Sequence, residues 1–541
     1  MKHYFSLTLL ATAVLAGCAT TSITPTDVTN GYNSIQADEL AKHVKVLASD
    51  EFGGRAPSSP GEKLTLDYLT AQFKALGLEP GNGDSYLQEV PLVSLEADSN
   101  MVLSIGGKDY QYKKDMVMGS SRISAQEGIE NSELVFVGYG VNAPEYNWND
   151  YEGLDVKGKT VVMLVNDPGF ATKDPALFTG DAMTYYGRWT YKYEEASRQG
   201  AAGAIIIHET APASYPWSVV ENSWSGEQFG FQKENNNMDR VAVEGWVTTD
   251  VAKELFTKAG LDFETAKENA AKGAYHVDMG DLTASVNVKN TIKKSVSYNF
   301  IATLPGSEQP DEHVIYSAHW DHLGTDKTRK GDQIYNGAHD NATGTAGLIE
   351  VAEAFTKLPK HPSRSMTFLA VTAEEQGLLG SKYYAANPVI AANKTVANIN
   401  MDSLNLLGKV KDMNVVGIGK SQMDEFLATA AKEQGRTISG DPKPSSGGYY
   451  RSDHFAFANM GIPAMYAGGG TVAADEETAN YRKRMSLVLR GCYHQPCDRY
   501  RDEWDLSGAV QDLQLFYKVG FDISEQEQWP TWNANSEFQR K

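Results

Sequence analysis

The chain has 541 residues and a formal net charge of −20, and 41% of its residues are hydrophobic and 22% are charged. Because a single hydrophobic core stops growing well below this length, two or three domains are expected. The excess of acidic residues argues against nucleic acid as a partner and indicates high solubility. It also suits a site that attracts cationic amino termini, although most of such a charge lies on solvated surface.

The first residues have the features of an export signal. A weakly basic start precedes an apolar stretch from Tyr4 to Leu15, which is too short to span a bilayer as a stable helix. The stretch ends in Leu-Ala-Gly-Cys at Cys18, which resembles the bacterial lipoprotein signal, whose cysteine is lipidated and becomes the mature N-terminus. We predict a lipoprotein signal peptide over residues 1–17; the alternative is an ordinary cleaved signal with an incidental cysteine.

The lipoprotein resemblance also implies a location. Ala19 follows Cys18, and the absence of Asp at that position points toward the outer membrane in such bacteria, with the protein facing the periplasm. Contact with the membrane is then expected only through the N-terminal lipid. Residues 18–36 are rich in Thr, Ser and Asn, which predicts a flexible tether.

Three of four polar clusters in the middle of the chain directly follow short apolar runs. Runs such as residues 366–371 have the length and the β-branched or aromatic content of buried strands. Open α/β sheets bind ligands at the carboxyl ends of their strands, so we expect these clusters to meet at one edge of a sheet. The clusters are Ala318–His322, Gly337–Asn341, Thr372–Glu375 and Asn400–Asp402.

The composition of these clusters predicts a metal site. Carboxylates crowded into one place repel each other and are costly to desolvate, and a divalent cation removes both problems. Imidazole and carboxylate without thiolate suit zinc and, less specifically, manganese or cobalt. We assign His319 and Asp402 to one metal, Glu375 to a second and Asp340 as the bridge between them. His494, late in the chain, supplies the second histidine.

Two acidic residues beside these ligands have other expected roles. Asp321 lies two residues after His319 and is expected to accept the other ring N–H, which fixes the tautomer. Glu374 adjoins a ligand but is not needed as one, so it is free to act as a general base on a water shared by the metals. The structural alternatives are that an Asp after a strand caps a helix and that paired Glu residues favour a helix N-terminus.

The polar clusters and the late histidine follow one another in the order His-x-Asp, Asp-Asn-x-x-Gly, Glu-Glu, Asp and His. This order resembles that of the co-catalytic di-zinc aminopeptidase family, which also contains carboxypeptidases acting on acidic C-termini. The similarity runs from about Ala37 to about Gln526. It implies an α/β fold with a mixed central sheet sandwiched by helices, two Zn²⁺ ions, and the ligands and general base assigned above. It therefore implies a peptidase that hydrolyses the N-terminal residues of peptides.

An inserted unit is expected between the two halves of the catalytic domain. There, apolar runs are separated by loops rich in Gly, Asn and Asp, and the fragment Trp148–Tyr151 looks like a piece of the mainly-β protease-associated domain found in many such peptidases. That resemblance implies a lid or substrate-access module without chemistry of its own. The predicted division is signal peptide 1–17, tether 18–36, first catalytic segment 37–125, insert 126–290, second catalytic segment 291–526 and C-terminal tail 527–541.

A segment near residue 450 resembles the family segment whose tyrosine stabilises the tetrahedral oxyanion. Tyr449 occupies the matching position, and a shift of one residue would select Tyr450 instead. Arg451 follows, and we expect it to meet either a substrate carboxylate or a nearby ligand carboxylate.

The late histidine lies between two cysteines. Once Cys18 is set aside, Cys492 and Cys497 are the remaining cysteines, and they flank His494. In an exported protein this spacing suggests a disulfide loop that holds the histidine in place, whereas thiolate ligation of a metal is the alternative.

Two other functions stay open at this point. A carboxypeptidase for acidic C-terminal residues would need a basic pocket, for which Arg451 is a candidate. A non-catalytic peptide-binding or scaffold protein would keep the fold without the chemistry. Nothing in the sequence indicates an oligomeric state.

Overall fold

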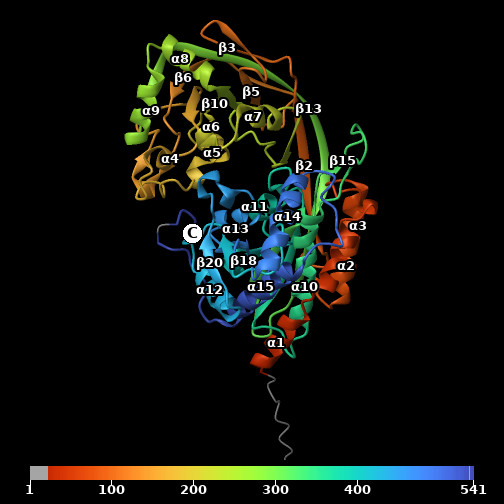
Figure 1. The fold of residues 1–541 in the computed structure, drawn as a ribbon. Helices are drawn as coiled ribbons and strands as arrows, with labels where there is room; N and C mark the ends of the chain where they lie inside the picture. The colour runs from red at the N-terminus through yellow and green to blue at the C-terminus, as the bar shows by residue number, and fades with distance from the viewer. Residues whose placement is uncertain (1–21, 535, 541) are drawn as a thin grey trace, which may run out of the picture.

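The computed structural model describes residues 22–534 and 536–540. Figure 1 shows a larger lobe and a smaller lobe, with the long strand β13 (Val277–Leu304) running along one side of both. The predicted signal peptide and the predicted lipidation at Cys18 lie outside the described residues. Within those residues, every helix is too short or too polar to cross a membrane.

A mixed sheet forms the centre of the larger lobe. Its middle strands run parallel in the order β17 (Arg364–Val371), β14 (Gln309–His319), β18 (Thr395–Asn400) and β21 (Ala464–Gly469). All residues of β17 and β18 are buried, as expected of strands covered on both faces. Antiparallel strands border this parallel group: β13, β2 (Leu87–Ala97) and β11 (Glu227–Phe231) on one side, and β19 (Asp412–Val415) with β20 (Thr437–Gly440) on the other.

Helices cover both faces of this sheet. Because side chains alternate along a strand, Tyr316 faces one layer and its neighbour Ile315 the other. The first layer contains α2 (Ala37–Leu47), α3 (Pro60–Ala75), α10 (Thr343–Thr356), α12 (Met423–Glu433) and α15 (Ser507–Glu525), and the second contains α11 (Leu379–Ala386) and α13 (His454–Asn459). The predicted mixed α/β sheet between helices is therefore confirmed.

The smaller lobe has its own sheet and its own apolar core. Strands β6 (Gln126–Phe136), β9 (Thr160–Leu164), β10 (Gly203–His208) and β12 (Val243–Thr248) run parallel, and β5 (Met116–Gly119) and the first portion of β13 pair antiparallel at its sides. Helices α5 (Trp189–Arg198), α8 (Thr249–Lys258) and α9 (Phe263–Lys272) pack on it.

The structure differs from the expected division of the chain in three places. Strands β3 (Val102–Ile105), β4 (Lys108–Gln111) and β5 belong to the core of the smaller lobe, so this lobe begins near residue 98 instead of 126. In the expected tether, Pro25–Ser34 forms helix α1, which packs against α10 and α15. In the expected tail, Trp532 and Phe538 are buried. Short strands and single aromatic anchors leave little trace in a sequence pattern.

Helix α15 lies close against strand β14, the strand that ends in His319. The hydroxyl of Tyr316 donates a hydrogen bond of 2.9 Å to the carbonyl oxygen of Phe516 on α15. Gly520, one turn further along α15, lies so close that a Cβ atom there would overlap the Tyr316 hydroxyl. A glycine is therefore required for this contact between helix and strand.

We expect Gly520→Ala to lower the free energy of unfolding by about 1–3 kcal/mol, because α15 must move away from β14 to make room. The matched control is Gly491→Ala on helix α14 (Glu476–Cys492), where a Cβ meets nothing within 4 Å. That change is expected to be neutral or to stabilise by up to about 1 kcal/mol. Urea unfolding followed by circular dichroism measures both, and equal effects would contradict the proposed close contact.

Candidate metal centre

The structure brings the five predicted metal ligands together at the carboxyl ends of β14, β17 and β18. Nε2 of His319 lies 3.2 Å from one carboxylate oxygen of Asp340 and 3.5 Å from Oδ1 of Asp402. Nε2 of His494 lies 3.2 Å from the other oxygen of Asp340 and 3.0 Å from Oε2 of Glu375. The side chains thus form two groups of one imidazole and two carboxylates, and Asp340 contributes one oxygen to each.

These residues fit a divalent cation. The ligand atoms of His319, Asp340 and Asp402 all lie within 4.8 Å of one another. Nε2 of His319 is buried, yet it forms no hydrogen bond within the described chain although carboxylates surround it. Imidazole and carboxylate oxygen without thiolate are the donors that zinc takes in catalytic sites.

His322 also contacts the predicted ligands, although no role for it was predicted from the sequence alone. Its Nδ1 lies 2.5 Å from Oε1 of Glu375, and it forms a second possible ligand group with Asp340 and Glu375. The signal was present in the sequence, because His322 follows His319 by three residues just after a strand. The contact leaves Glu375 held between His322 and His494.

Asp321 has a different contact from the one expected. The Nδ1 atom of His319 lies 3.2 Å from the backbone carbonyl oxygen of Asp321 but 3.8 Å from its carboxylate. The carboxylate instead accepts hydrogen bonds from the backbone N–H groups of Glu374 (3.1 Å) and Glu375 (3.4 Å). Asp321 therefore links the loop after β14 to the loop after β17, and burial raises its pKa to about 7.

Glu374 stands at the wall of an open cavity of about 450 Å³. Burial raises the pKa of its carboxyl group well above the ordinary value, and the charges of Asp453 and Asp402 act in the same direction although His319 opposes them. A carboxyl group in this setting exchanges a proton more readily near neutral pH than an exposed one. The cavity is also lined by Asp340, Asp402, Arg451, Tyr466 and Tyr493.

Three residues at the centre have backbone conformations that are uncommon for residues other than glycine. Ala373 precedes Glu374 and has a φ of +52°, Ser403 follows Asp402 with +58°, and His494 itself has +54°. Such left-handed conformations persist only when the surrounding structure holds them, and they cluster at functional sites.

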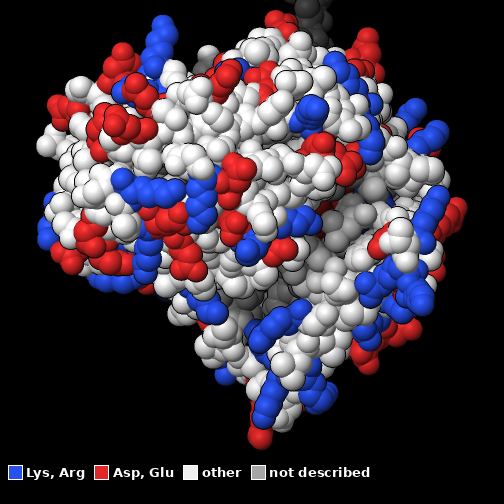
Figure 2. All heavy atoms as spheres, turned by 90° about the horizontal axis from the view of Figure 1, so that it is seen from above, with Lys and Arg blue, Asp and Glu red and all other residues white. Residues whose placement is uncertain are grey.

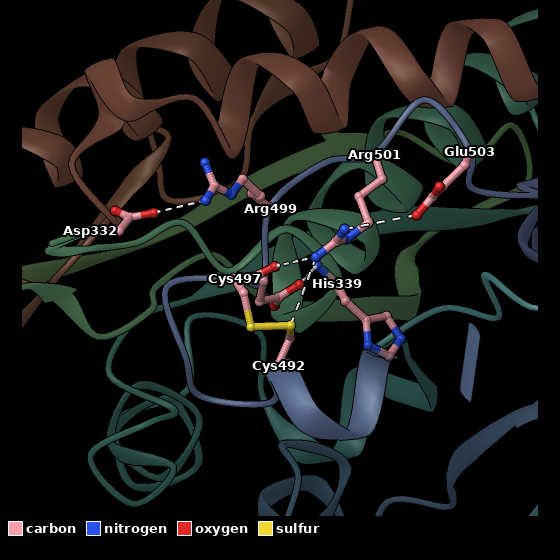
Figure 3. Close-up of a disulfide and its surroundings, with 8 residues drawn as sticks. Asp332, His339, Cys492, Cys497, Arg499, Arg501 and Glu503 are labelled. Atoms are coloured by element: carbon pink, nitrogen blue, oxygen red, sulfur yellow. Dashed lines mark hydrogen bonds and ion pairs between the residues drawn. A yellow bond between two sulfur atoms is a disulfide. The ribbon is translucent and has the colours of Figure 1, made fainter. Parts of the chain in front are cut away.

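A disulfide closes the loop that carries His494. Cys492 and Cys497 are bonded to each other, and the nearby Arg501 donates to the carbonyl oxygen of Cys497 at 3.4 Å (Figure 3). The next residue, Asp498, accepts hydrogen bonds from the backbone N–H groups of His339 (2.9 Å) and Asp340 (3.1 Å). The loop of one predicted ligand is thereby tied to the backbone of another.

A serine holds Asp402 in a similar way. The hydroxyl of Ser452 donates to Oδ2 of Asp402 at 2.7 Å, and the amide of Asn400 donates to Ser452 Oγ at 2.8 Å. One carboxylate oxygen of Asp402 is thus fixed by Ser452, which leaves Oδ1 facing His319.

The predicted oxyanion donors are not in the cavity. The ring of Tyr449 packs against His454 and Phe538, and its buried hydroxyl has no hydrogen-bond partner in the described chain. The hydroxyl of Tyr450 contacts the carbonyl oxygen of Met183 at 3.2 Å and Oε1 of Glu537 at 3.0 Å. Both rings turn toward the C-terminal residues, and neither tyrosine is among the residues that line the cavity.

Tyrosines from other elements occupy the cavity instead. Tyr466 lies on β21, and Tyr493 directly precedes His494. Burial, followed by the charges of Asp402 and Asp340, raises the pKa of Tyr466 well above its ordinary value, so its hydroxyl keeps its proton. The proximity of Tyr493 to a predicted ligand was a signal available in the sequence. Arg451 does line the cavity, as a substrate-binding role requires.

Arg55 lies behind the cluster and is fully buried. Its guanidinium donates four hydrogen bonds of 2.6–2.8 Å to the backbone carbonyl oxygens of Leu47, Trp320, Asn336 and Gly337. Burial lowers its pKa to about 10, although Asp498, Asp321 and Asp340 oppose the shift. One side chain therefore connects the end of α2 to the loops on either side of the predicted ligands and supplies a positive charge beneath them.

We expect Arg55→Met to lower the free energy of unfolding by about 3–5 kcal/mol, because it leaves buried carbonyl oxygens without donors and buried carboxylates without their counter-charge. Arg55→Lys keeps the charge but has no planar fork of donors, so it is expected to recover only a fraction of the loss. Chemical denaturation measures both variants. A stability equal to the wild type in Arg55→Met would refute the structural role.

Comparison with known proteins relates this centre to a family of peptidases. Residues 299–517 match the model of Peptidase family M28. An aminopeptidase of Pseudomonas aeruginosa is 23% identical over 490 residues, which cover 86% of this chain and 76% of that protein. Leupeptin-inactivating enzyme 1 of Streptomyces exfoliatus is 25% identical over 244 residues, which cover 44% of this chain and half (50%) of the length of that protein.

Among solved structures, an aminopeptidase from Aneurinibacillus sp. strain AM-1 compares with this chain at a TM-score of 0.49 and 19% identity, covering 95% of this chain and 100% of that one. The family match spans strands β14, β17, β18 and β21 and every predicted metal ligand from His319 to His494. Residues 299–517, which carry every predicted metal ligand, are therefore similar to peptidase family M28.

Proposed function

We propose that the chain is a zinc-dependent aminopeptidase, an exopeptidase that hydrolyses the N-terminal residues of peptides. The observation that carries this proposal is the pair of imidazole–carboxylate groups that share Asp340, beside Glu374 in an open cavity. The match to a peptidase family over these residues and the relatives named aminopeptidase support it.

Two zinc ions would be held by residues of this cluster. His319, Asp340 and Asp402 would hold one, and His494, Asp340 and Glu375 the other. Zinc, when bound, supplies a Lewis acid for the scissile carbonyl group. His322 orients Glu375, and Ser452 orients Asp402.

Glu374 is the proposed general base and general acid. It takes a proton from the attacking water and later gives one to the leaving amine, which typically contributes about 10²–10⁴ in rate. The raised pKa of its carboxyl group favours uptake of that proton. The Tyr466 hydroxyl, which keeps its proton and lines the cavity, takes the place of Tyr449 as the proposed donor to the developing oxyanion.

The relatives named aminopeptidase favour this function over a carboxypeptidase. The charges of Asp340 and Asp402 do not decide between the two, because both residues line the cavity as proposed zinc ligands and bound zinc would offset their charge.

The smaller lobe is proposed as an inserted protease-associated domain that covers the substrate entrance. The backbone N–H of Met183 in this lobe donates to the carbonyl oxygen of Pro444 at 3.2 Å, next to residues that line the cavity. We also propose that the chain is exported and anchored to the outer membrane by lipid at Cys18. A disulfide is compatible with an oxidising compartment.

Replacing the proposed base tests the mechanism. In Glu374→Gln we expect kcat on leucine p-nitroanilide to fall by about 10²–10⁴, because the amide cannot accept a proton. Zinc content by elemental analysis and the melting temperature should stay close to the wild type. Normal turnover in this variant would remove Glu374 as the base.

Removing the shared ligand tests the metal assignment. In Asp340→Ala we expect loss of bound zinc from both positions and loss of activity, because each position loses one of its carboxylates. The matched control is Asp441→Ala, which removes a carboxylate that lines the same cavity but lies outside the ligand groups. Full zinc occupancy in Asp340→Ala would refute the shared ligand.

A further inference from the structure

Two arginines contact the same short segment beside the cavity, Arg188 at Gly447 and Arg451 at Ser446, and neither has an acidic partner within the described residues. Arg451 lines the cavity with an exposed side chain, and its Nη2 donates to the carbonyl oxygen of Ser446 at 3.0 Å. In the described ranges, no carboxylate oxygen lies within 4.0 Å of either the Arg451 or the Arg188 guanidinium. Elsewhere acidic and basic side chains are interspersed, as the surface in Figure 2 shows.

Arg188 comes from the smaller lobe, directly before α5. Its side chain packs on Gly447, where an added Cβ would lie 3.5 Å from Arg188 Cδ, and the residues on either side of Gly447, Ser446 and Gly448, line the cavity. Its guanidinium donates no hydrogen bond within the described chain. Burial lowers the pKa of Arg188 to about 10, and the positive charge of Arg451 acts in the same direction.

This arrangement favours an anion. The Arg188 guanidinium forms no hydrogen bond within the described chain, and its nitrogens are not among the fully buried ones that lack a partner, so it stays open to a ligand. The positive charge of Arg451 nearby adds to the attraction for an anion. Asp441 also lines the cavity, but its Oδ1 accepts from the backbone N–H of Lys443 at 2.7 Å, and its carboxylate pairs with neither arginine. Guanidinium groups match the planar, two-oxygen geometry of a carboxylate.

The position of the pair relative to the metal centre indicates which anion this is. Arg451 shares one cavity of about 450 Å³ with Asp340, Glu374 and Asp402. A cavity of that size holds a small ligand such as a short peptide. An anion bound at the arginines would therefore belong to the same molecule whose amine and scissile carbonyl face the carboxylates.

We propose that Arg188 and Arg451 together bind a carboxylate of the substrate, so that the enzyme selects peptides with a carboxylate close to the scissile bond on its leaving-group side. The carboxylate is either the C-terminus of a dipeptide or tripeptide or the side chain of an acidic residue. This rests on the proposed aminopeptidase function and deepens it. It also gives the smaller lobe a role in specificity, because Arg188 belongs to that lobe.

The test compares matched substrates on the zinc-loaded full-length protein. Leu-Leu and Leu-Leu-amide differ only in the C-terminal carboxylate, and Leu-Glu-amide and Leu-Gln-amide differ only in an acidic side chain. We expect the acidic member of at least one pair to have the higher kcat/KM, by about tenfold to a hundredfold, mainly through KM. The pair that shows the preference identifies the source of the carboxylate.

Substitution of the arginines must remove this preference. In Arg188→Gln and Arg451→Gln we expect the ratio of kcat/KM within the preferred pair to fall toward one. Arg188→Lys and Arg451→Lys should retain part of the preference for the acidic substrate, because the positive charge stays but the planar guanidinium with its paired donors is lost. Arg484→Gln is the matched control, since it removes an exposed arginine on α14, and it should keep the wild-type ratio.

Several outcomes would overturn the inference. These are a wild-type ratio near one for both pairs, a ratio that Arg188→Gln and Arg451→Gln leave intact, or equal losses on both members of a pair. Hydrolysis of leucine p-nitroanilide, which has no carboxylate, reports separately on the proposed function. If the wild type does not hydrolyse leucine p-nitroanilide, calorimetry can measure the binding of Leu-Leu and Leu-Leu-amide to Glu374→Gln. Equal affinities would contradict the inference, and tighter binding of Leu-Leu would support it.

Discussion

The mutual repulsion of buried carboxylates is the constraint on which the rest of this structure depends. Two unit charges 4 Å apart repel by about 4 kcal/mol at an effective dielectric constant near 20, and here several carboxylates share one edge of the sheet. Positive charge and hydrogen bonds around the carboxylates reduce this repulsion. Arg55 supplies a positive charge beneath the cluster, the imidazoles of His319 and His494 lie among the carboxylates, and backbone N–H groups donate to Asp321 and Asp498. The remaining negative charge faces the cavity, which is the arrangement that divalent cations stabilise.

The features of the site that the sequence predicts are those fixed by strand order and strand ends. His319 ends β14, and Glu375 and Asp402 follow β17 and β18, so parallel pairing of neighbouring strands is enough to bring them together. Asp340 and His494 come from loops, so strand order does not place them, and they were predicted from the ligands that two metals need and from the family resemblance. Their positions depend on contacts such as that of Asp498 with the Asp340 backbone, which joins residues that are far apart in the chain.

The features that the sequence did not predict depend on packing between distant segments. Tyr449 has the spacing expected of a catalytic tyrosine, but the C-terminal residues supply Phe538 as a packing partner and turn the ring away from the cavity. The four carbonyl partners of Arg55 come from segments far apart in the chain, so no local sequence pattern predicts its structural role. The boundary of the smaller lobe was missed for a related reason, since β13 passes from one sheet to the other without a linker.

Both lobes contribute to the proposed substrate site. The sheet of the larger lobe carries the proposed zinc ligands and Glu374 at its edge, whereas Arg188 belongs to the smaller lobe and packs on Gly447, between two residues that line the cavity. With the scissile carbonyl group at the metal ligands and a carboxylate at the arginines, a short peptide fits in one orientation and the reverse is disfavoured. Charge complementarity of this kind acts on specificity more strongly than on affinity, because the wrong orientation places like charges together. Arg188 belongs to the lobe whose Met183 contacts Pro444, so this contact between the lobes helps to place Arg188 beside the cavity.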